Sequence, residues 1–237
     1  MDKVDVPYKM TINYEKHFDT WTKPLAPLLE SNYMYNLMVF LHELYKSAEQ
    51  PRPLKREVFQ VFREVPYAHV RVVILSDEPF TDMKGNGIAL ATAERALMTP
   101  SEITDKVHEC VETTIYKGCR PGFDLTLEPW LKQGVFPMHA ALTTGYNKPR
   151  EHVKIWREFT RYVIKRLSNS SPGLIFILLG KEAGEYRKFI SETDHYVLTY
   201  HTPKWSAKQN VKWNCPLFKR ANDILIKNTG SDSAIVW

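Results

Sequence analysis

The run Val70-Arg71-Val72-Val73-Ile74-Leu75, followed directly by Ser76-Asp77-Glu78-Pro79-Phe80, decides the fold class of this 237-residue chain. Most residues of the run are β-branched, and they do not alternate with polar residues as in a half-exposed strand. The run therefore predicts a strand that is buried on both faces and ends at an acidic segment. Three later runs are read in the same way, at Val135–Met138, Leu174–Leu179 and Val197–Tyr200.

Helical patterns alternate with these strands. Apolar residues at helical spacing start at Tyr33 and predict a helix that stops before Pro51. Thr99-Pro100-Ser101-Glu102 is a helix start signal, with Thr99 as the expected cap. Further helices are expected over 153–167, 182–190 and 216–227. We expect an α/β fold, a three-layer α/β/α sandwich with a central parallel sheet of about four strands. Residues 1–30 are expected to be an irregular N-terminal lead-in to a single domain over 1–237.

Composition narrows the class of protein. Hydrophobic residues make up 43% of the chain and charged residues 25%, as in globular proteins. The three cysteines, at Cys110, Cys119 and Cys215, have no disulfide or zinc spacing, so we expect no metal and no cofactor. A soluble, intracellular protein with no membrane partner is expected, because no apolar run is long enough to span a bilayer. The net charge of +5 permits an anionic partner without identifying one.

Polar segments follow all four predicted strands. They are Ser76–Asp82, His139–Thr143, Gly180-Lys181 and His201–Ser206. Ligands bind at the carboxyl ends of parallel strands, so these segments predict a site in which a carboxylate faces a histidine. The alternative is structural, with Asp77 and Asp82 capping a turn and His139 a hydrogen-bonded core residue. A phosphate-binding glycine loop and a Gly-x-Ser-x-Gly motif are both missing from the sequence, which argues against nucleotide hydrolysis and serine-hydrolase chemistry.

In order and spacing, these segments resemble the family 1 uracil-DNA glycosylases. Val72–Phe80 resembles the family's strand and water-activating loop, Gly-Gln-Asp-Pro-Tyr-His. Asn86–Ala91 resembles the segment with the base-stacking Phe, and Trp130–Thr143 the stretch that ends near the uracil-reading Asn. His201-Thr202-Pro203-Lys204-Trp205-Ser206 resembles the His-Pro-Ser-Pro-Leu-Ser intercalation loop.

The resemblance implies catalytic roles for Glu78, Asp77 and His201. Glu78 stands at the position of the family's water-positioning Asp, with Asp77 beside it, and either carboxylate could face the pocket. His201 matches the His that stabilises the departing base.

The resemblance also implies a base pocket in which three residues depart from the family. Phe80 replaces the Tyr that blocks the methyl group of thymine, and Leu90 replaces the stacking Phe. His139 replaces the Asn that pairs with uracil, and an imidazole cannot present a donor and an acceptor side by side as an amide does. We therefore expect a remodelled, degenerate pocket in a strongly diverged member of the family.

DNA-contacting residues are implied on two segments. On the first, Trp205 and Lys204 occupy the positions of the Leu wedge and the last Pro, and Ser206, Lys208 and Lys212 follow. On the second, Pro51 and Pro53 match a proline-rich loop that touches the DNA backbone in the family. The alternatives are that Trp205 packs on the fold or anchors a protein partner, and that the lysines are solvated.

Three functional hypotheses stay open. The first is a protein that binds DNA or a protein partner, such as a replication or host–virus factor, with weak or absent uracil excision. The second is an active DNA glycosylase in base-excision repair that hydrolyses the N-glycosidic bond of a modified base. The third is an ordinary uracil-DNA glycosylase. Each places the protein in the nucleus or another compartment that contains DNA.

Overall fold

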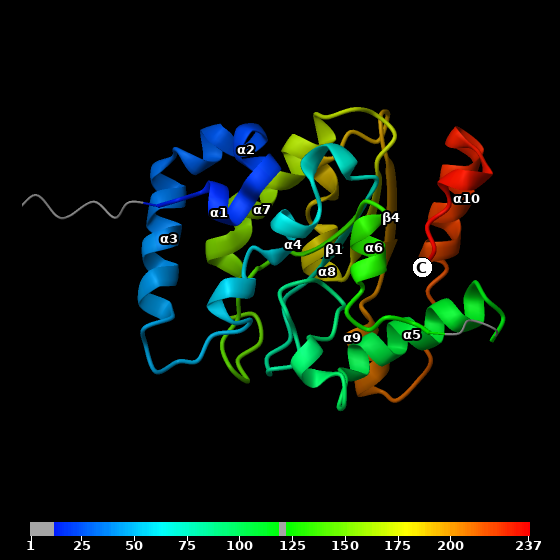
Figure 1. Cartoon of the computed structure of the whole chain (residues 1–237), viewed down its shortest axis with the longest axis horizontal. Coiled ribbons are helices and arrows are strands. Elements are labelled where there is room, and N and C mark those ends of the chain that lie inside the picture. The colour runs from blue at the N-terminus through cyan, green and yellow to red at the C-terminus, as the bar shows by residue number, and fades with distance from the viewer. Residues whose placement is uncertain (1–11, 119–121) are drawn as a thin grey trace, which may run out of the picture.

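Four parallel strands form the centre of the structure, a computed structural model that describes residues 12–118 and 122–237 (Figure 1). They are β1 (Val72–Ser76), β2 (Val135–His139), β3 (Ile175–Leu179) and β4 (Tyr196–Tyr200). Their order in the sheet is β2-β1-β3-β4, with Ser76 level with His139 on one side and with Leu179 on the other. The expected parallel sheet is confirmed, and its register brings the ends of β1 and β2 together.

Burial differs between the strands. Every residue of β1, β2 and β3 is buried, as their uninterrupted apolar runs predict. In β4 only Leu198 is buried, and Tyr196 is 39% exposed. The strand order places β4 at one edge of the sheet, and the expectation of burial on both faces is wrong for it.

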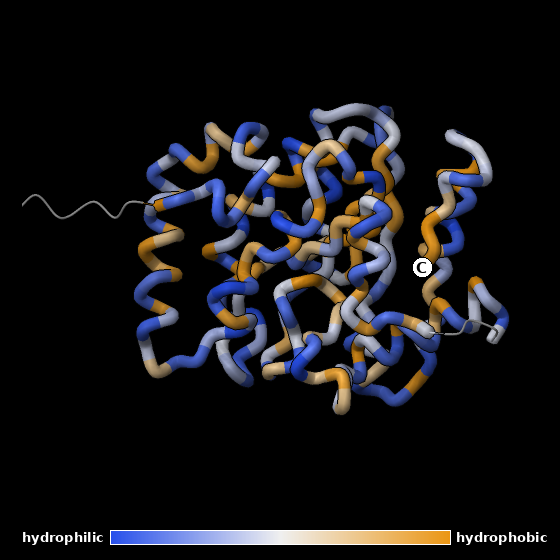
Figure 2. The backbone as a smooth tube through the Cα atoms, in the orientation of Figure 1, coloured by the Kyte–Doolittle hydropathy of each residue, from blue (hydrophilic) through white to orange (hydrophobic). Residues whose placement is uncertain are grey.

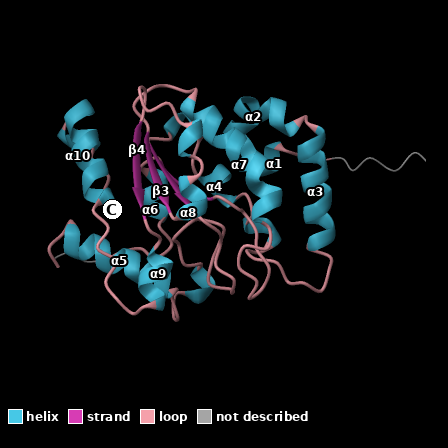
Figure 3. Ribbon diagram, turned by 180° about the vertical axis from the view of Figure 1, so that it is seen from behind, coloured by secondary structure: helices cyan, strands magenta, loops and turns pink. Residues whose placement is uncertain are grey.

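Helices cover both faces of the sheet. In Figures 1 and 3, α7 with α1, α2 and α3 lies on one side of the strands and α10 on the other, which confirms the expected α/β layers. Helices α5 and α9 lie beyond the carboxyl ends of the strands, where the two pack against each other. The helix bounds are α1 Glu15–Phe18, α2 Thr22–Leu29, α3 Asn32–Leu44, α4 Gln60–Glu64, α5 Glu102–Thr114, α6 Glu128–Lys132, α7 Val153–Ser168, α8 Lys181–Gly184, α9 Pro203–Lys208 and α10 Leu217–Thr229.

Several helix predictions need correction. The part of the lead-in that the structure describes is helical (α1 and α2), because Phe18, Trp21 and Leu25 are fully buried against the core. The expectation that the helix from Tyr33 stops before Pro51 is confirmed, since α3 ends at Leu44. The helix expected over 182–190 is split into α8 and a 3₁₀ turn at Arg187–Phe189.

The cap of α5 is Ser101 rather than Thr99. The Ser101 hydroxyl accepts a hydrogen bond from the Ile103 N–H, and this satisfies one of the free amides at the start of the helix. Pro100 therefore precedes the helix instead of lying in its first turn.

Hydropathy follows this layering. In Figure 2 the strands are mainly hydrophobic, while α3 and α10 alternate between hydrophilic and hydrophobic residues, as expected for helices with one buried face. Cys110 and Cys215 are free and buried; Cys119 lies outside the described residues. No helix within the described ranges is long and apolar enough to cross a membrane.

Candidate functional site

A cavity of about 330 Å³ opens at the carboxyl ends of β1 and β2. Chain segments that are far apart in the sequence meet there, because parallel strands end at the same edge of a sheet. Five of the six residues expected to form the site line this cavity; the exception is His201. The lining residues are Ser76, Asp77, Glu78, Phe80, Leu90, Ile103, His139, Pro149, Arg150, Thr202, Pro203 and Lys204.

Glu78 forms an ion pair with Lys204. The Lys204 ammonium donates a hydrogen bond of 2.8 Å from Nζ to Glu78 Oε1. The Glu78 side chain is only 6% exposed, whereas that of Lys204 is 52% exposed, so the ammonium reaches in from solvent. The second carboxylate oxygen of Glu78 is buried and has no hydrogen-bond partner among residues 12–118 and 122–237. This carboxylate is thus partly neutralised and still has a free acceptor.

Asp77 has a different partner. Its Oδ1 accepts a hydrogen bond of 3.1 Å from the Ala183 N–H in α8. A Cβ added at Gly180, where φ is +100°, would lie 2.5 Å from either carboxylate oxygen of Asp77. Gly180 therefore permits both the turn into α8 and the close approach of this carboxylate. Burial raises the pKa of Asp77, and the hydrogen bond from Ala183 partly opposes this shift.

His139, the last residue of β2, is a neutral imidazole in this cavity. The residue is 4% exposed, and burial, followed by the positive charge of Lys204, lowers its pKa to about 3. Its Nδ1 is buried without a hydrogen-bond partner in the described part of the chain. His139 is therefore not the hydrogen-bonded core histidine of the structural alternative.

Apolar side chains form the rest of the wall. Phe80, Leu90 and Ile103 line the cavity, and Phe80 and Leu90 are nearly fully buried. Leu90 takes a φ of +72°, a left-handed conformation that is unfavourable for leucine. The Thr104 hydroxyl donates a hydrogen bond of 2.8 Å to the Leu90 carbonyl, which holds this backbone in place.

His201 lies outside the cavity. Its ring is exposed, stacks on Tyr200 with 4.3 Å between centroids, and meets the edge of Trp205 at 5.6 Å. The three residues after it, Thr202 to Lys204, line the cavity instead. The structure therefore does not bring His201 opposite a carboxylate, and Lys204 takes that place against Glu78.

The residues expected to contact DNA separate into exposed and buried ones. Trp205 is 57% exposed, and Lys208 and Lys212 are on the surface, with Lys212 Nζ 3.9 Å from Glu109 Oε1. Pro51, Pro53 and Ser206 are buried. The Tyr45 hydroxyl donates to the Pro53 carbonyl. Their role in DNA binding stays a prediction, and the buried side chains would need to become accessible for direct contact.

Arg150 lies in the cavity, although it was not identified as a site residue from the sequence. It precedes α7, lines the cavity and pairs with the buried Glu182. A single arginine outside any motif does not indicate in the sequence that its side chain lines the cavity. Pro149 and Ile103 were missed as well.

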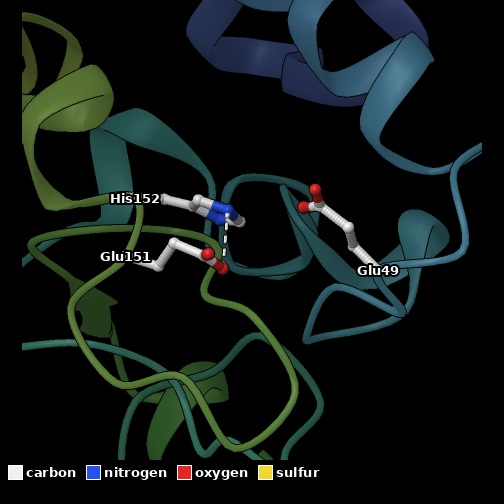
Figure 4. A group of neighbouring side chains, drawn as sticks. All are labelled: Glu49, Glu151 and His152. Atoms are coloured by element: carbon white, nitrogen blue, oxygen red, sulfur yellow. Dashed lines mark ion pairs between the residues drawn. The ribbon is translucent and has the colours of Figure 1, made fainter.

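A separate group of side chains could hold a metal ion. Glu49, Glu151 and His152 each place one ligand atom within 4.8 Å of the other two (Figure 4). His152 is buried, and its Nδ1 lies 3.0 Å from the Thr143 hydroxyl, while its Nε2 lies 3.5 Å from Glu151 Oε2. One histidine and two carboxylates suit a divalent cation such as Zn²⁺. None of the three lines the 330 Å³ cavity, and the expectation of a protein without metal stays a prediction.

Comparison with known proteins gives relatives over nearly the whole chain. No family model matches the sequence. A uracil-DNA glycosylase from Fusobacterium nucleatum is 32% identical over 219 residues, which cover 92% of this chain and 94% of the relative. A uracil-DNA glycosylase from Acinetobacter baumannii is 30% identical over 210 residues, which cover 87% of each chain.

Solved structures agree with the fold. A mimivirus uracil-DNA glycosylase superimposes with a TM-score of 0.78 at 18% identity and covers 92% of this chain and 87% of its own. A variant of that protein in complex with UGI reaches a TM-score of 0.82 at 18% identity, over 95% of this chain and 91% of its own. At this level of identity the likeness concerns the fold.

Proposed function

Because this chain belongs to the uracil-DNA glycosylase family, we propose that it is a diverged member that binds DNA and excises uracil weakly or not at all. The ion pair between Lys204 and Glu78 carries this proposal. Glu78 stands at the position of the family's water-positioning carboxylate, and an ammonium group 2.8 Å away competes with water for that carboxylate. Lost water positioning lowers the rate of hydrolysis directly.

The base pocket supports the same proposal. A neutral His139 offers one donor and one acceptor on opposite sides of its ring, which cannot pair with uracil as an amide does. Leu90 provides no aromatic face for an extruded base. The exposed His201 would have to move toward the cavity before it could stabilise a departing base.

DNA remains the best partner for the surface beside the cavity. Trp205 projects from the short helix α9 next to Lys204 and Lys208, and a second cavity of about 410 Å³ lies between this helix and Glu78 to Lys84. An exposed Trp can stack on bases, while lysines pair with phosphates. A protein partner that covers Trp205 is the competing occupant.

The test compares excision with binding. Excess protein is incubated with duplexes that carry one uracil, one hydroxymethyluracil or no modification, and abasic sites are detected by alkaline cleavage. Binding of the same duplexes is measured by fluorescence anisotropy. We expect binding without appreciable uracil release. Rapid release of uracil would contradict the proposal, and release of hydroxymethyluracil alone would favour an active DNA glycosylase with changed base choice.

A gain-of-function variant tests the reason for low activity. We expect His139→Asn combined with Leu90→Phe to raise uracil release about 10- to 100-fold, since it restores an edge reader and a stacking face. The larger side chain at the buried Leu90 costs roughly 1–3 kcal/mol of stability, so thermal melting is the control. A folded double variant with unchanged activity would show that these two residues do not limit excision.

A further inference from the structure

Lys204 places a primary amine at the mouth of the cavity. It lines both the 330 Å³ cavity and the neighbouring 410 Å³ cavity, and its side chain is 52% exposed. We propose that the Lys204 amine condenses with the aldehyde of an abasic deoxyribose and so captures abasic DNA as a Schiff base. This inference rests on the proposed function, because it needs DNA at this surface.

The composition of the cavity favours Lys204 as the reacting group. Among its lining residues in the described part of the chain, Lys204 is the one with a primary amine, and Arg150 is the other cation. A guanidinium stays protonated and does not condense with carbonyls, whereas a lysine amine does so once it loses a proton. Lys227, an exposed lysine of α10 that lines neither cavity, serves as the control amine.

Glu78 supplies the proton acceptor that this chemistry needs. Its Oε1 already accepts the hydrogen bond from Lys204 Nζ at 2.8 Å, which is the reach required for general-base catalysis. Its Oε2 is buried without a partner among the described residues and can accept a second hydrogen bond, from the sugar or a water molecule. Amine and base are therefore already paired before substrate arrives.

The reaction can be written with atoms balanced. Glu78 takes one proton from the Lys204 ammonium and leaves a neutral amine. The nitrogen lone pair attacks C1′ of the open-chain aldehyde, a C–N bond forms, and the carbonyl oxygen becomes the hydroxyl of a carbinolamine. Proton return from Glu78 lets this hydroxyl leave as water, and the product is a protonated imine. The oxidation state does not change, so no further reactant is needed.

A base in this cavity would lack the paired donor and acceptor that read its edge, whereas an abasic sugar does not need them. Phe80, Leu90 and Ile103 offer apolar surface, and the neutral His139 lacks the paired donor and acceptor that read a base edge. A sugar without a base leaves no such edge unpaired. The volume of about 330 Å³ is at the small end for ligand pockets.

Borohydride trapping tests the inference directly. Protein is mixed with a duplex that carries one natural abasic site, sodium cyanoborohydride reduces any imine, and the covalent adduct is counted on a denaturing gel. A second duplex carries a tetrahydrofuran site, which has no aldehyde, and its binding is measured by anisotropy. The variants are Lys204→Arg, which keeps the charge, Lys227→Arg as the control on α10, and Glu78→Gln.

We expect an adduct with the unaltered protein and with Lys227→Arg. Lys204→Arg should lower the adduct yield at least about tenfold while it still binds the tetrahydrofuran duplex. Glu78→Gln should slow adduct formation by about 100-fold, within the usual range for loss of a general base. Thermal melting of each variant confirms folding.

Other outcomes overturn the inference in distinguishable ways. Binding of the tetrahydrofuran duplex without any adduct would refute the Schiff base and leave the proposed DNA binding intact. An adduct that forms undiminished with Lys204→Arg, or whose yield falls equally with Lys227→Arg, would show that other amines react. Failure to bind either duplex would remove both the proposed function and this inference.

Discussion

At the scale of single residues, the ion pair between Lys204 and Glu78 is the observation on which the proposed function rests. A half-exposed ammonium meets a carboxylate with a 6% exposed side chain, so solvent screens one partner and hardly reaches the other. Exposed pairs contribute little to stability, while a buried carboxylate that loses its partner is costly. We therefore expect the pair to stabilise the junction between the segment after β1 and α9, and under the proposed function the same contact weakens water positioning.

A double-mutant cycle measures this coupling. We expect Lys204→Met and Glu78→Gln, each alone and combined, to give a coupling energy of about 1 kcal/mol in denaturant unfolding. The exposed pair Lys219 and Asp223, one helical turn apart in α10, is the control and should give about 0.3–0.5 kcal/mol. Coupling at Lys204 no larger than in the control would mean that the ion pair is not maintained in solution.

His139 makes stability depend on pH. Its pKa is lowered to about 3 in the folded protein, so the unfolded chain, with an ordinary histidine pKa near 6.5, binds the proton more readily. The resulting stability is fully present above pH 6.5 and is lost as pH falls toward 3. We expect His139→Asn to reduce the slope of unfolding free energy against pH between 6 and 4 by up to one proton, about 1.4 kcal/mol per pH unit. An unchanged slope would mean that this imidazole titrates normally.

At the scale of elements, helix α9 contributes residues both to the 330 Å³ cavity and to the exposed surface beside it. Within this six-residue helix, Pro203 and Lys204 line the 330 Å³ cavity, while Trp205 and Lys208 are exposed to solvent. Pro in the first turn presets the helical backbone there. Helix α9 therefore connects a partner that binds at the exposed Trp205 to the Glu78 carboxylate in the cavity, through Lys204.

Substitutions on α9 should separate stacking from charge. We expect Trp205→Ala to weaken DNA binding by about 1–3 kcal/mol at all salt concentrations. Lys208→Ala should instead reduce the slope of log affinity against log salt by about 0.9, out of about 2.7 for three phosphate contacts. Lys227→Ala, on the exposed side of α10, is the control. If DNA affinity changes neither with salt concentration nor with the two α9 substitutions, a protein partner becomes the better occupant of this surface.

At the scale of the whole molecule, the sheet brings the site together from distant segments. Glu78 follows β1, His139 is the last residue of the neighbouring strand β2, and Lys204 follows the edge strand β4. A ligand held by all three segments binds the folded state and not the unfolded chain. Duplex DNA at 100 times its Kd should add about 2.7 kcal/mol and raise Tm by about 5–10 °C. A Tm that does not respond at low salt would contradict binding at this composite site.

The sequence by itself determined the sheet and most of the cavity. The apolar runs of β1, β2 and β3 form buried strands, because their hydrophobic faces must be covered on both sides, and the run of β4 is the exception. The segments after β1 and β2 could therefore be placed at one edge, and Asp77, Glu78, Phe80, Leu90 and His139 do line one cavity there.

Only the tertiary structure decided which side chains face one another. Adjacent carboxylates at Asp77 and Glu78 look equivalent in the sequence, yet one meets the Ala183 N–H and the other meets Lys204. His201 and Lys204 stand three residues apart on the same loop, and the turn into α9 directs the amine inward and leaves the imidazole outside. Such choices depend on side-chain packing and on contacts between segments more than 100 residues apart, which periodicity and motif spacing do not encode.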